Sequence, residues 1–154
     1  MRSKKAFKII YTGLLAGFVS EAVLGGLFMS PPVQFALYNP EWQSDLFIEI
    51  TFNRDLVKSI IGLIILSIAH SWLYDLFKPS IPGHNWLKKG LFWGFTIWLM
   101  YWVFQEWFIY HTLLKEPLLL NILELTILLI GSIVEGLIIA KLLNQQNGEK
   151  KIHA

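Results

Sequence analysis

The chain has 154 residues, of which 55% are hydrophobic and only 16% are charged. A soluble domain carries about 25% charged residues, and one domain of this length has too small an interior to bury so much apolar surface. The composition therefore predicts an integral membrane protein whose outer surface contacts the lipid bilayer. The formal net charge of +2 is small, and the basic residues stand at the ends of apolar segments, so we expect no nucleic-acid partner.

The residue types that are missing exclude several chemistries. The chain has no cysteine, which rules out disulfides, thiolate nucleophiles, iron–sulfur clusters and thiolate metal sites. It also lacks a P-loop, a glycine-rich dinucleotide fingerprint, a helical His-Glu-x-x-His motif and a Gly-x-Ser-x-Gly elbow. We therefore assign no catalytic residue and no metal site from motifs, and the sequence names no cofactor.

Four apolar segments predict transmembrane helices. They cover approximately residues 8–29, 55–77, 87–111 and 118–143, and each is long enough to cross a bilayer at about 1.5 Å per residue. Residues 144–154 are polar and form a predicted cytoplasmic tail. Because the connections are short, we expect an all-α, single transmembrane domain over residues 1–154, in which the four helices form an antiparallel bundle.

The topology is predicted from the distribution of charge. Ten of the 13 Lys and Arg residues stand on the side that carries the two termini, so the positive-inside rule places both termini in the cytoplasm of a multi-pass cell-membrane protein. The longest connection, residues 31–54, contains a segment with acids at Glu41, Asp45 and Glu49. This segment, residues 41–52, fits a short amphipathic helix in the membrane interface, and an irregular loop fits it equally well.

The first apolar segment carries a stripe of small residues with one acid in it. Gly13, Gly17, Glu21 and Gly25 are four residues apart and therefore share one side of a helix. Glycine in such a stripe allows another helix to approach closely. A carboxylate at this depth is costly, so Glu21 marks a functional position or a buried polar contact. Two further glycines that we assign to helix packing are Gly94 and Gly131.

The other intramembrane polar residues fall into two predicted layers. Counted from the segment centres, Glu21, Glu106 and Glu124 lie in an outer layer, and His70 and Glu135 lie in an inner one. Four more side chains are assigned to the same pocket, of which the two indoles fit simple packing as well: Trp98, Trp102, Gln105 and Asn121.

No Lys or Arg stands at the depth of the outer acids. Like charge and loss of water both oppose ionisation of a carboxyl group. The acids must therefore hold protons, bind a cation or face water.

These observations favour a proton- or cation-coupled transporter or permeation unit that uses the intramembrane carboxylates. Two alternatives remain open. The polar faces could bind a partner protein, which would make the chain an accessory or structural membrane subunit. The acids and His70 could instead hold a metal or a lipid substrate in a membrane-embedded enzyme. A homo-oligomer or another membrane subunit is the expected protein partner, and the sequence specifies neither the ion nor the oligomeric state.

Overall fold

In a computed structural model, residues 2–42 and 55–144 are described, and every regular element in these ranges is helical. The all-α prediction is therefore confirmed for this part of the chain. Residues 43–54, which contain most of the predicted interfacial helix, lie outside the described ranges. The elements in chain order are α1 (Arg2–Phe28), α2 (Pro31–Leu37), η1 (Pro40–Trp42), α4 (Leu56–Phe77), α5 (Trp86–Ile97), η2 (Trp98–Trp102), η3 (Gln105–Leu113) and α6 (Leu118–Asn144).

Three of these helices are long and apolar enough to cross a membrane, namely Ser3–Phe28 within α1, all of α4 and all of α6. The chain is therefore built as a membrane protein. The segment predicted as the third span, residues 87–111, is also helical, but it is divided into α5 and two π-helical segments, η2 and η3. A fourth crossing stays a prediction. The short helix α2 was not predicted from the sequence.

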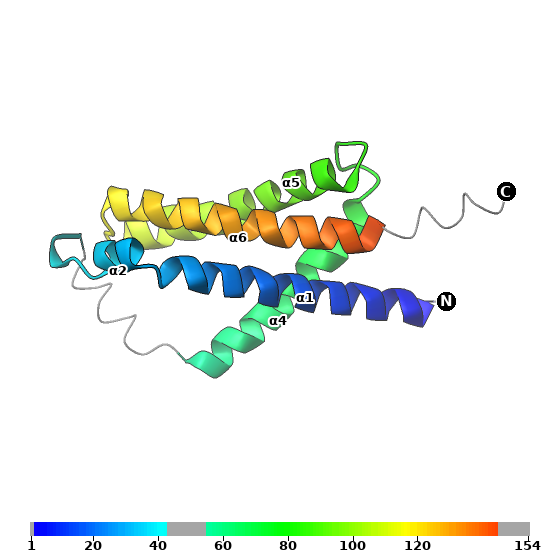
Figure 1. The fold of residues 1–154 in the computed structure, drawn as a ribbon, viewed down its shortest axis with the longest axis horizontal. Coiled ribbons are helices and arrows are strands. Elements are labelled where there is room, and N and C mark those ends of the chain that lie inside the picture. The colour runs from blue at the N-terminus through cyan, green and yellow to red at the C-terminus, as the bar shows by residue number, and fades with distance from the viewer. Residues whose placement is uncertain (1, 43–54, 145–154) are drawn as a thin grey trace.

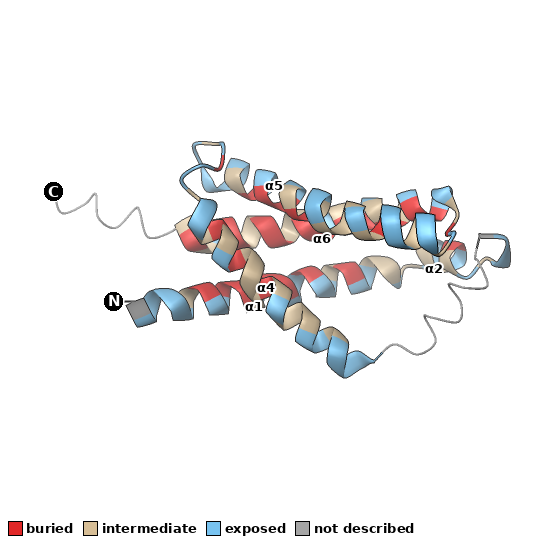
Figure 2. Cartoon of the chain, turned by 180° about the vertical axis from the view of Figure 1, so that it is seen from behind, coloured by how far each residue is buried: buried red, intermediate tan, exposed pale blue. Residues whose placement is uncertain are grey.

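Figure 1 shows an elongated bundle in which the first turn of α1 and the last turn of α6 lie at the same end, which we call the termini end. The central helix is α6, which packs against α1 on one side and α5 on the other, while α4 packs mainly against α1. In Figure 1 α4 crosses the other helices obliquely, so its N-terminal half diverges from them. Burial follows this arrangement, because α6 is buried along much of its length and α4 is exposed over its first turns (Figure 2).

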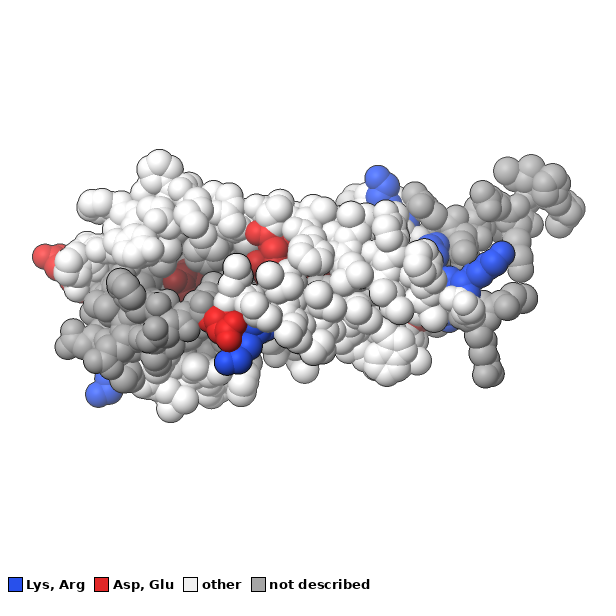
Figure 3. Space-filling model, turned by 90° about the horizontal axis from the view of Figure 1, so that it is seen from below, with Lys and Arg blue, Asp and Glu red and all other residues white. Residues whose placement is uncertain are grey.

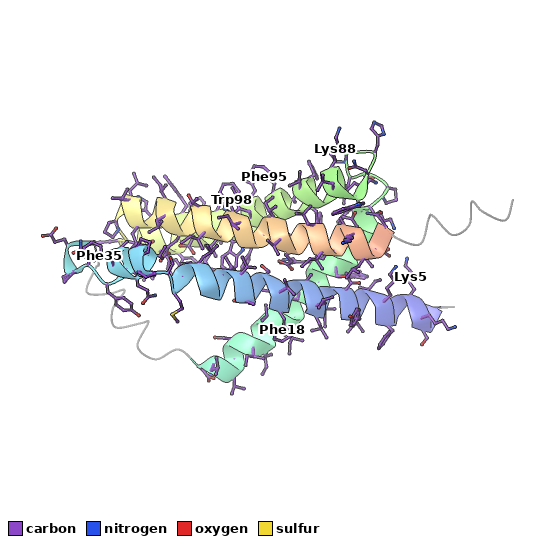
Figure 4. The ribbon with its side chains drawn as sticks, in the orientation of Figure 1. Lys5, Phe18, Phe35, Lys88, Phe95 and Trp98 are labelled. Carbon is purple, nitrogen blue, oxygen red and sulfur yellow. The ribbon has the colours of Figure 1, made fainter. Side chains whose placement is uncertain are left out.

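The outward faces are apolar along the bundle and basic at one end. Large exposed side chains include Phe18, Ile61 and Phe104, as expected of a surface that contacts lipid tails. Lys88 and Phe95 lie on the side of α5 that faces away from α6 (Figure 4). Most of the visible Lys and Arg side chains gather at the end of the molecule where the termini lie (Figure 3), which is the asymmetry on which the topology prediction rests.

Local sequence signals fix where the helices begin. The Asp55 carboxylate accepts hydrogen bonds from the backbone N–H groups of Val57 and Lys58, at 3.0 and 3.1 Å, and so caps α4. Asn85 caps α5 through the Lys88 N–H, at 2.9 Å. Such caps satisfy amide groups that have no partner within the helix. Between α4 and α5, Gly83 has a φ of +117°, a conformation that side chains disfavour.

The polar contacts at the termini end join α1, α4 and α6. Lys5 forms an ion pair with Asp75 at 2.7 Å, and the Lys78 ammonium group donates to the backbone carbonyl of Leu143 at 2.7 Å. Burial lowers the pKa of Lys78, and nearby Asp75 opposes this effect. These contacts hold the C-terminal end of α4 against the bundle, so the divergence of α4 is confined to its other half.

The first glycine contact brings α1 and α4 together. A β-carbon at Gly13 would lie 2.5 Å from the backbone oxygen of Ser67, and one at Gly17 would overlap the Ser67 side chain. Only glycine therefore allows this crossing. The predicted packing role of these two glycines agrees with the geometry, and the contact places Ser67 at the centre of the α1–α4 interface, where it is buried.

The second glycine contact joins α5 to α6. A β-carbon at Gly94 would lie 2.5 Å from the Ser132 backbone oxygen, and one at Gly136 would overlap the backbone of Gly94. Gly131 faces the Leu24 side chain of α1, to which an added β-carbon would be 2.6 Å away. Gly25 differs from the other predicted packing positions, because it is exposed and an added β-carbon would meet no described atom within 4 Å.

The contrast between Gly13 and Gly25 provides a matched test on one helix. We expect Gly13→Ala to lower the free energy of unfolding by about 2 kcal/mol, because the methyl group would push α4 away from α1. Gly25→Ala adds the same methyl group where there is space, and it should leave stability unchanged. Thermal unfolding of both variants in one detergent measures the difference. Equal stability of the two variants would contradict the close α1–α4 crossing.

Candidate functional site

A pocket of about 290 Å³ opens beside the α1–α4 crossing. Residues of α1, α4, the π-helical segments and α6 line it. Each of these elements contributes polar side chains to the lining. The polar and titratable residues that line it are Ser20, Glu21, Ser59, Ser67, His70, Tyr101, Gln105 and Glu135. Five helical elements, α1, α4, η2, η3 and α6, therefore contribute hydrogen-bonding groups to one cavity.

A contact between two titratable side chains of this pocket joins α4 to α6. The Nδ1 atom of His70 lies 2.9 Å from Oε1 of Glu135. The two side chains are 16% and 9% exposed, so the pair is largely shielded from solvent. With the proton on Nδ1 the ring donates to the carboxylate, which leaves Nε2 for a second proton or a second partner. These two residues were predicted to share one layer, and the contact between them was not predicted from the sequence.

Glu21 lines the same pocket from α1. Along α1, Gly17 packs closely against α4, and Ser20 and Glu21, one turn later, contribute polar groups to the pocket. Ser20 itself donates to the backbone carbonyl of Gly131, at 2.9 Å, and ties this part of α1 to α6. Glu21 is exposed, and it interacts electrostatically with Tyr101.

The aromatic and amide side chains of the third predicted span reach the pocket through the π-helical segments. Tyr101, Trp102 and Gln105 all line it, and the rings of Tyr101 and Trp102 meet edge to face with centroids 4.6 Å apart. A π-helix has wider turns than an α-helix and is frequently found at functional sites. Here the two π-helical segments carry three of the side chains that line the pocket.

A second polar group lies apart from the pocket, where η3 meets α6. Glu106, Glu116 and Glu124 are all buried, and one carboxylate oxygen from each lies within 4.8 Å of those of the other two. Two ionised carboxyl groups this close repel each other unless a proton or a cation lies between them. The structure thus separates the three predicted outer acids, since Glu106 and Glu124 meet here while Glu21 lines the pocket.

Asn121 connects the members of this group. Its amide nitrogen donates to the backbone oxygen of Glu106 at 2.8 Å and to Oε2 of Glu116 at 3.3 Å. The side chain is completely buried. The backbone carbonyl of Glu116 accepts a hydrogen bond from Nδ1 of His111 at 2.7 Å, so the turn that carries Glu116 is fixed on both sides.

Sequence reasoning missed Glu116, because this residue stands in the turn between two predicted spans. Its neighbour Lys115 has a φ of +59°, a conformation uncommon for a residue with a side chain. The reversal that results directs Glu116 into the bundle, where it is only 1% exposed. Burial raises the pKa of its carboxyl group, against the opposing effects of Asn121 and His111. No helical periodicity could have revealed this position.

Trp98 has a packing role. Its indole N–H donates to the backbone carbonyl of Leu125 on α6, at 2.8 Å, and its side chain packs against the buried cluster of Leu24, Ile127 and Leu128. Figure 4 labels its position on the bundle. A wider groove of about 670 Å³ lies between α1 and α4 near the termini, but apart from Lys5 and Asp75 its lining is apolar. The polar pocket is therefore the stronger candidate site.

Comparisons with protein-family models, with curated proteins and with solved structures find no match to this chain. The function must accordingly be argued from the residues and their geometry.

A double-mutant cycle tests whether the His70–Glu135 contact contributes to the fold. A hydrogen bond to a charged group is worth about 1.5 to 3 kcal/mol, so His70→Ala and Glu135→Ala should show a coupling energy in this range in detergent unfolding. Glu135→Gln keeps an acceptor oxygen and should lose less stability than Glu135→Ala. A coupling energy near zero would show that the pair does not form in the folded protein.

Proposed function

We propose that the protein is a small multi-pass protein of the cell membrane, with both termini in the cytoplasm, that moves protons or a proton-coupled cation through the polar pocket. One observation carries the proposal: Glu21, His70 and Glu135, from three different helices, line one cavity. Ionisable side chains inside apolar bundles are costly, and they recur in proton relays and ion pathways.

The His70–Glu135 contact supplies a proton-exchange step. A proton on Nδ1 can pass to the carboxylate along the 2.9 Å hydrogen bond, and the remaining ring nitrogen can accept another from the cavity. Glu21, on the open side, can exchange protons with water or hold a cation by its carboxylate oxygens. Tyr101 and Gln105 add hydrogen-bonding groups that can hydrate or orient the moving species.

The glycine contact gives the pocket a closed side. Gly13 and Gly17 press α1 against Ser67 of α4, and Glu21 stands on the side of this crossing that faces away from the termini. With the termini in the cytoplasm, the pocket in this conformation opens toward the outer side of the membrane. Passage to the cytoplasm would require α4 to move relative to α1 at the crossing.

Flux through reconstituted protein tests the proposal. Liposomes that contain the purified chain should show proton or cation flux driven by a pH or ion gradient, and Glu21→Gln should reduce it to the level of empty liposomes, because the amide neither exchanges a proton nor carries a charge. Glu41→Gln changes an exposed acid of η1 and is the matched control. Flux through Glu21→Gln equal to that of the unmodified protein would refute the proposal.

One observation favours a second function, that of an accessory subunit. The N-terminal half of α4 diverges from the bundle (Figure 1) and exposes large apolar side chains such as Leu56, Ile61 and Ile65. A transmembrane helix of another protein could pack there. The two functions predict different results for the purified chain, because an accessory subunit would give no flux by itself and a permeation unit would.

A further inference from the structure

We infer that Glu106, Glu116 and Glu124, together with the amide oxygen of Asn121, form a binding site for one hard divalent cation of the Ca²⁺, Mg²⁺ or Mn²⁺ class. The site lies where η3 joins α6 and is separate from the polar pocket. The inference does not depend on the proposed transport function, since it concerns residues that the pocket does not use.

The first argument is that buried oxygen atoms of this group have no partner. Among residues 2–42 and 55–144, the buried polar atoms without a hydrogen bond include Oε2 of Glu106, Oε1 of Glu116 and Oδ1 of Asn121. All three side chains are at most 2% exposed. Buried acceptors are nearly always satisfied, and leaving one unpaired costs about 1 to 3 kcal/mol. Three unpaired oxygen atoms in one group point to a bound metal cation, which accepts electron pairs from oxygen.

The second argument is that the three carboxyl groups converge on one small volume. The three carboxyl groups each offer an oxygen within 4.8 Å of the others, which is no wider than two opposite ligands of a Ca²⁺ ion at about 2.4 Å each. The Asn121 amide reaches the same place, since its nitrogen contacts Oε2 of Glu116. Its oxygen, the other end of the same planar group, is one of the unpaired atoms.

The third argument is charge. In the described part of the chain, no Lys or Arg forms an ion pair with any of the three acids. The buried carboxylates therefore have no basic partner to offset their charge, and a divalent cation compensates more of it than a monovalent one.

The donor atoms select the class of ion. Every available ligand is a carboxylate or amide oxygen, which suits hard cations and not the nitrogen- and sulfur-preferring transition metals. His111 stands nearby, but its Nδ1 is taken by the backbone carbonyl of Glu116, so it positions the turn. A bound cation would join η3, the turn at Lys115 and α6 through one centre.

Mn²⁺ binding to the purified, detergent-solubilised chain tests the site, because free Mn²⁺ is counted directly by its electron paramagnetic resonance signal. After treatment with a chelator, the protein should bind one Mn²⁺ per chain, and Ca²⁺ or Mg²⁺ should displace it. Glu116→Gln and, separately, Glu124→Gln should weaken binding about tenfold or more, since the charge and number of ligands set the affinity. The added cation should raise the unfolding temperature of the unmodified protein and not that of Glu116→Gln.

Two variants locate the binding. Glu41→Gln changes an exposed acid and should bind Mn²⁺ like the unmodified chain, whereas Glu21→Gln changes the acid of the polar pocket and should keep the Mn²⁺ site that Glu116→Gln weakens. Absence of Mn²⁺ binding by the unmodified chain at millimolar concentration would overturn the inference. Loss of Mn²⁺ binding in Glu21→Gln, with binding retained in Glu116→Gln, would also overturn it. Because metal binding is measured without flux, failure of the site and failure of the transport proposal give different results.

Discussion

The structure depends on direct backbone contact between helices at small residues. Gly13 and Gly17 bring α1 against Ser67 of α4, and Gly94 and Gly136 bring α5 against α6. In a bilayer there is little hydrophobic force between helices, so close packing and hydrogen bonds must hold them together. The same contacts determine where there is space, because two helices that touch at one point and cross at an angle must separate on either side of it. The polar pocket lies beside such a crossing.

Many of the polar side chains in the bundle belong to two groups that differ in accessibility and in chemistry. The pocket beside the α1–α4 crossing is open and hydrogen-bonded, and it combines acids, an imidazole, a phenol and an amide. The group at Glu106, Glu116 and Glu124 is closed, almost purely acidic and short of partners. An open pocket with several kinds of polar group suits the exchange of protons or ions. A closed group of unpaired carboxylate oxygens suits tight binding of one ion. The two proposals therefore address different sites and are tested by different measurements.

The π-helical segments link the two groups along the third predicted span. Tyr101, Trp102 and Gln105 line the pocket, and Glu106, the next residue, is buried in the acidic group. Adjacent residues of a helix point about 100° apart, so one segment can serve both. Trp98 stands at the start of this region and anchors it to α6 through the carbonyl of Leu125. A change in the geometry of the π-helical turns would alter both groups together.

The sequence by itself determined the helical class, the apolar surface and the identity of most polar residues involved. These follow from composition and from spacing along one helix, as for Gly13, Gly17 and Glu21, where a single periodicity places the residues on one side. Only the tertiary structure decided which polar residues meet. It brought His70 to Glu135 and placed Glu21 in a different group from Glu106 and Glu124. It also left no described atom within 4 Å of a β-carbon added at Gly25. These outcomes depend on crossing angles and on π-helical turns that no single segment encodes. Glu116 entered the site through a turn with Lys115 at positive φ, and such a reversal is set by the packing of the helices that it connects.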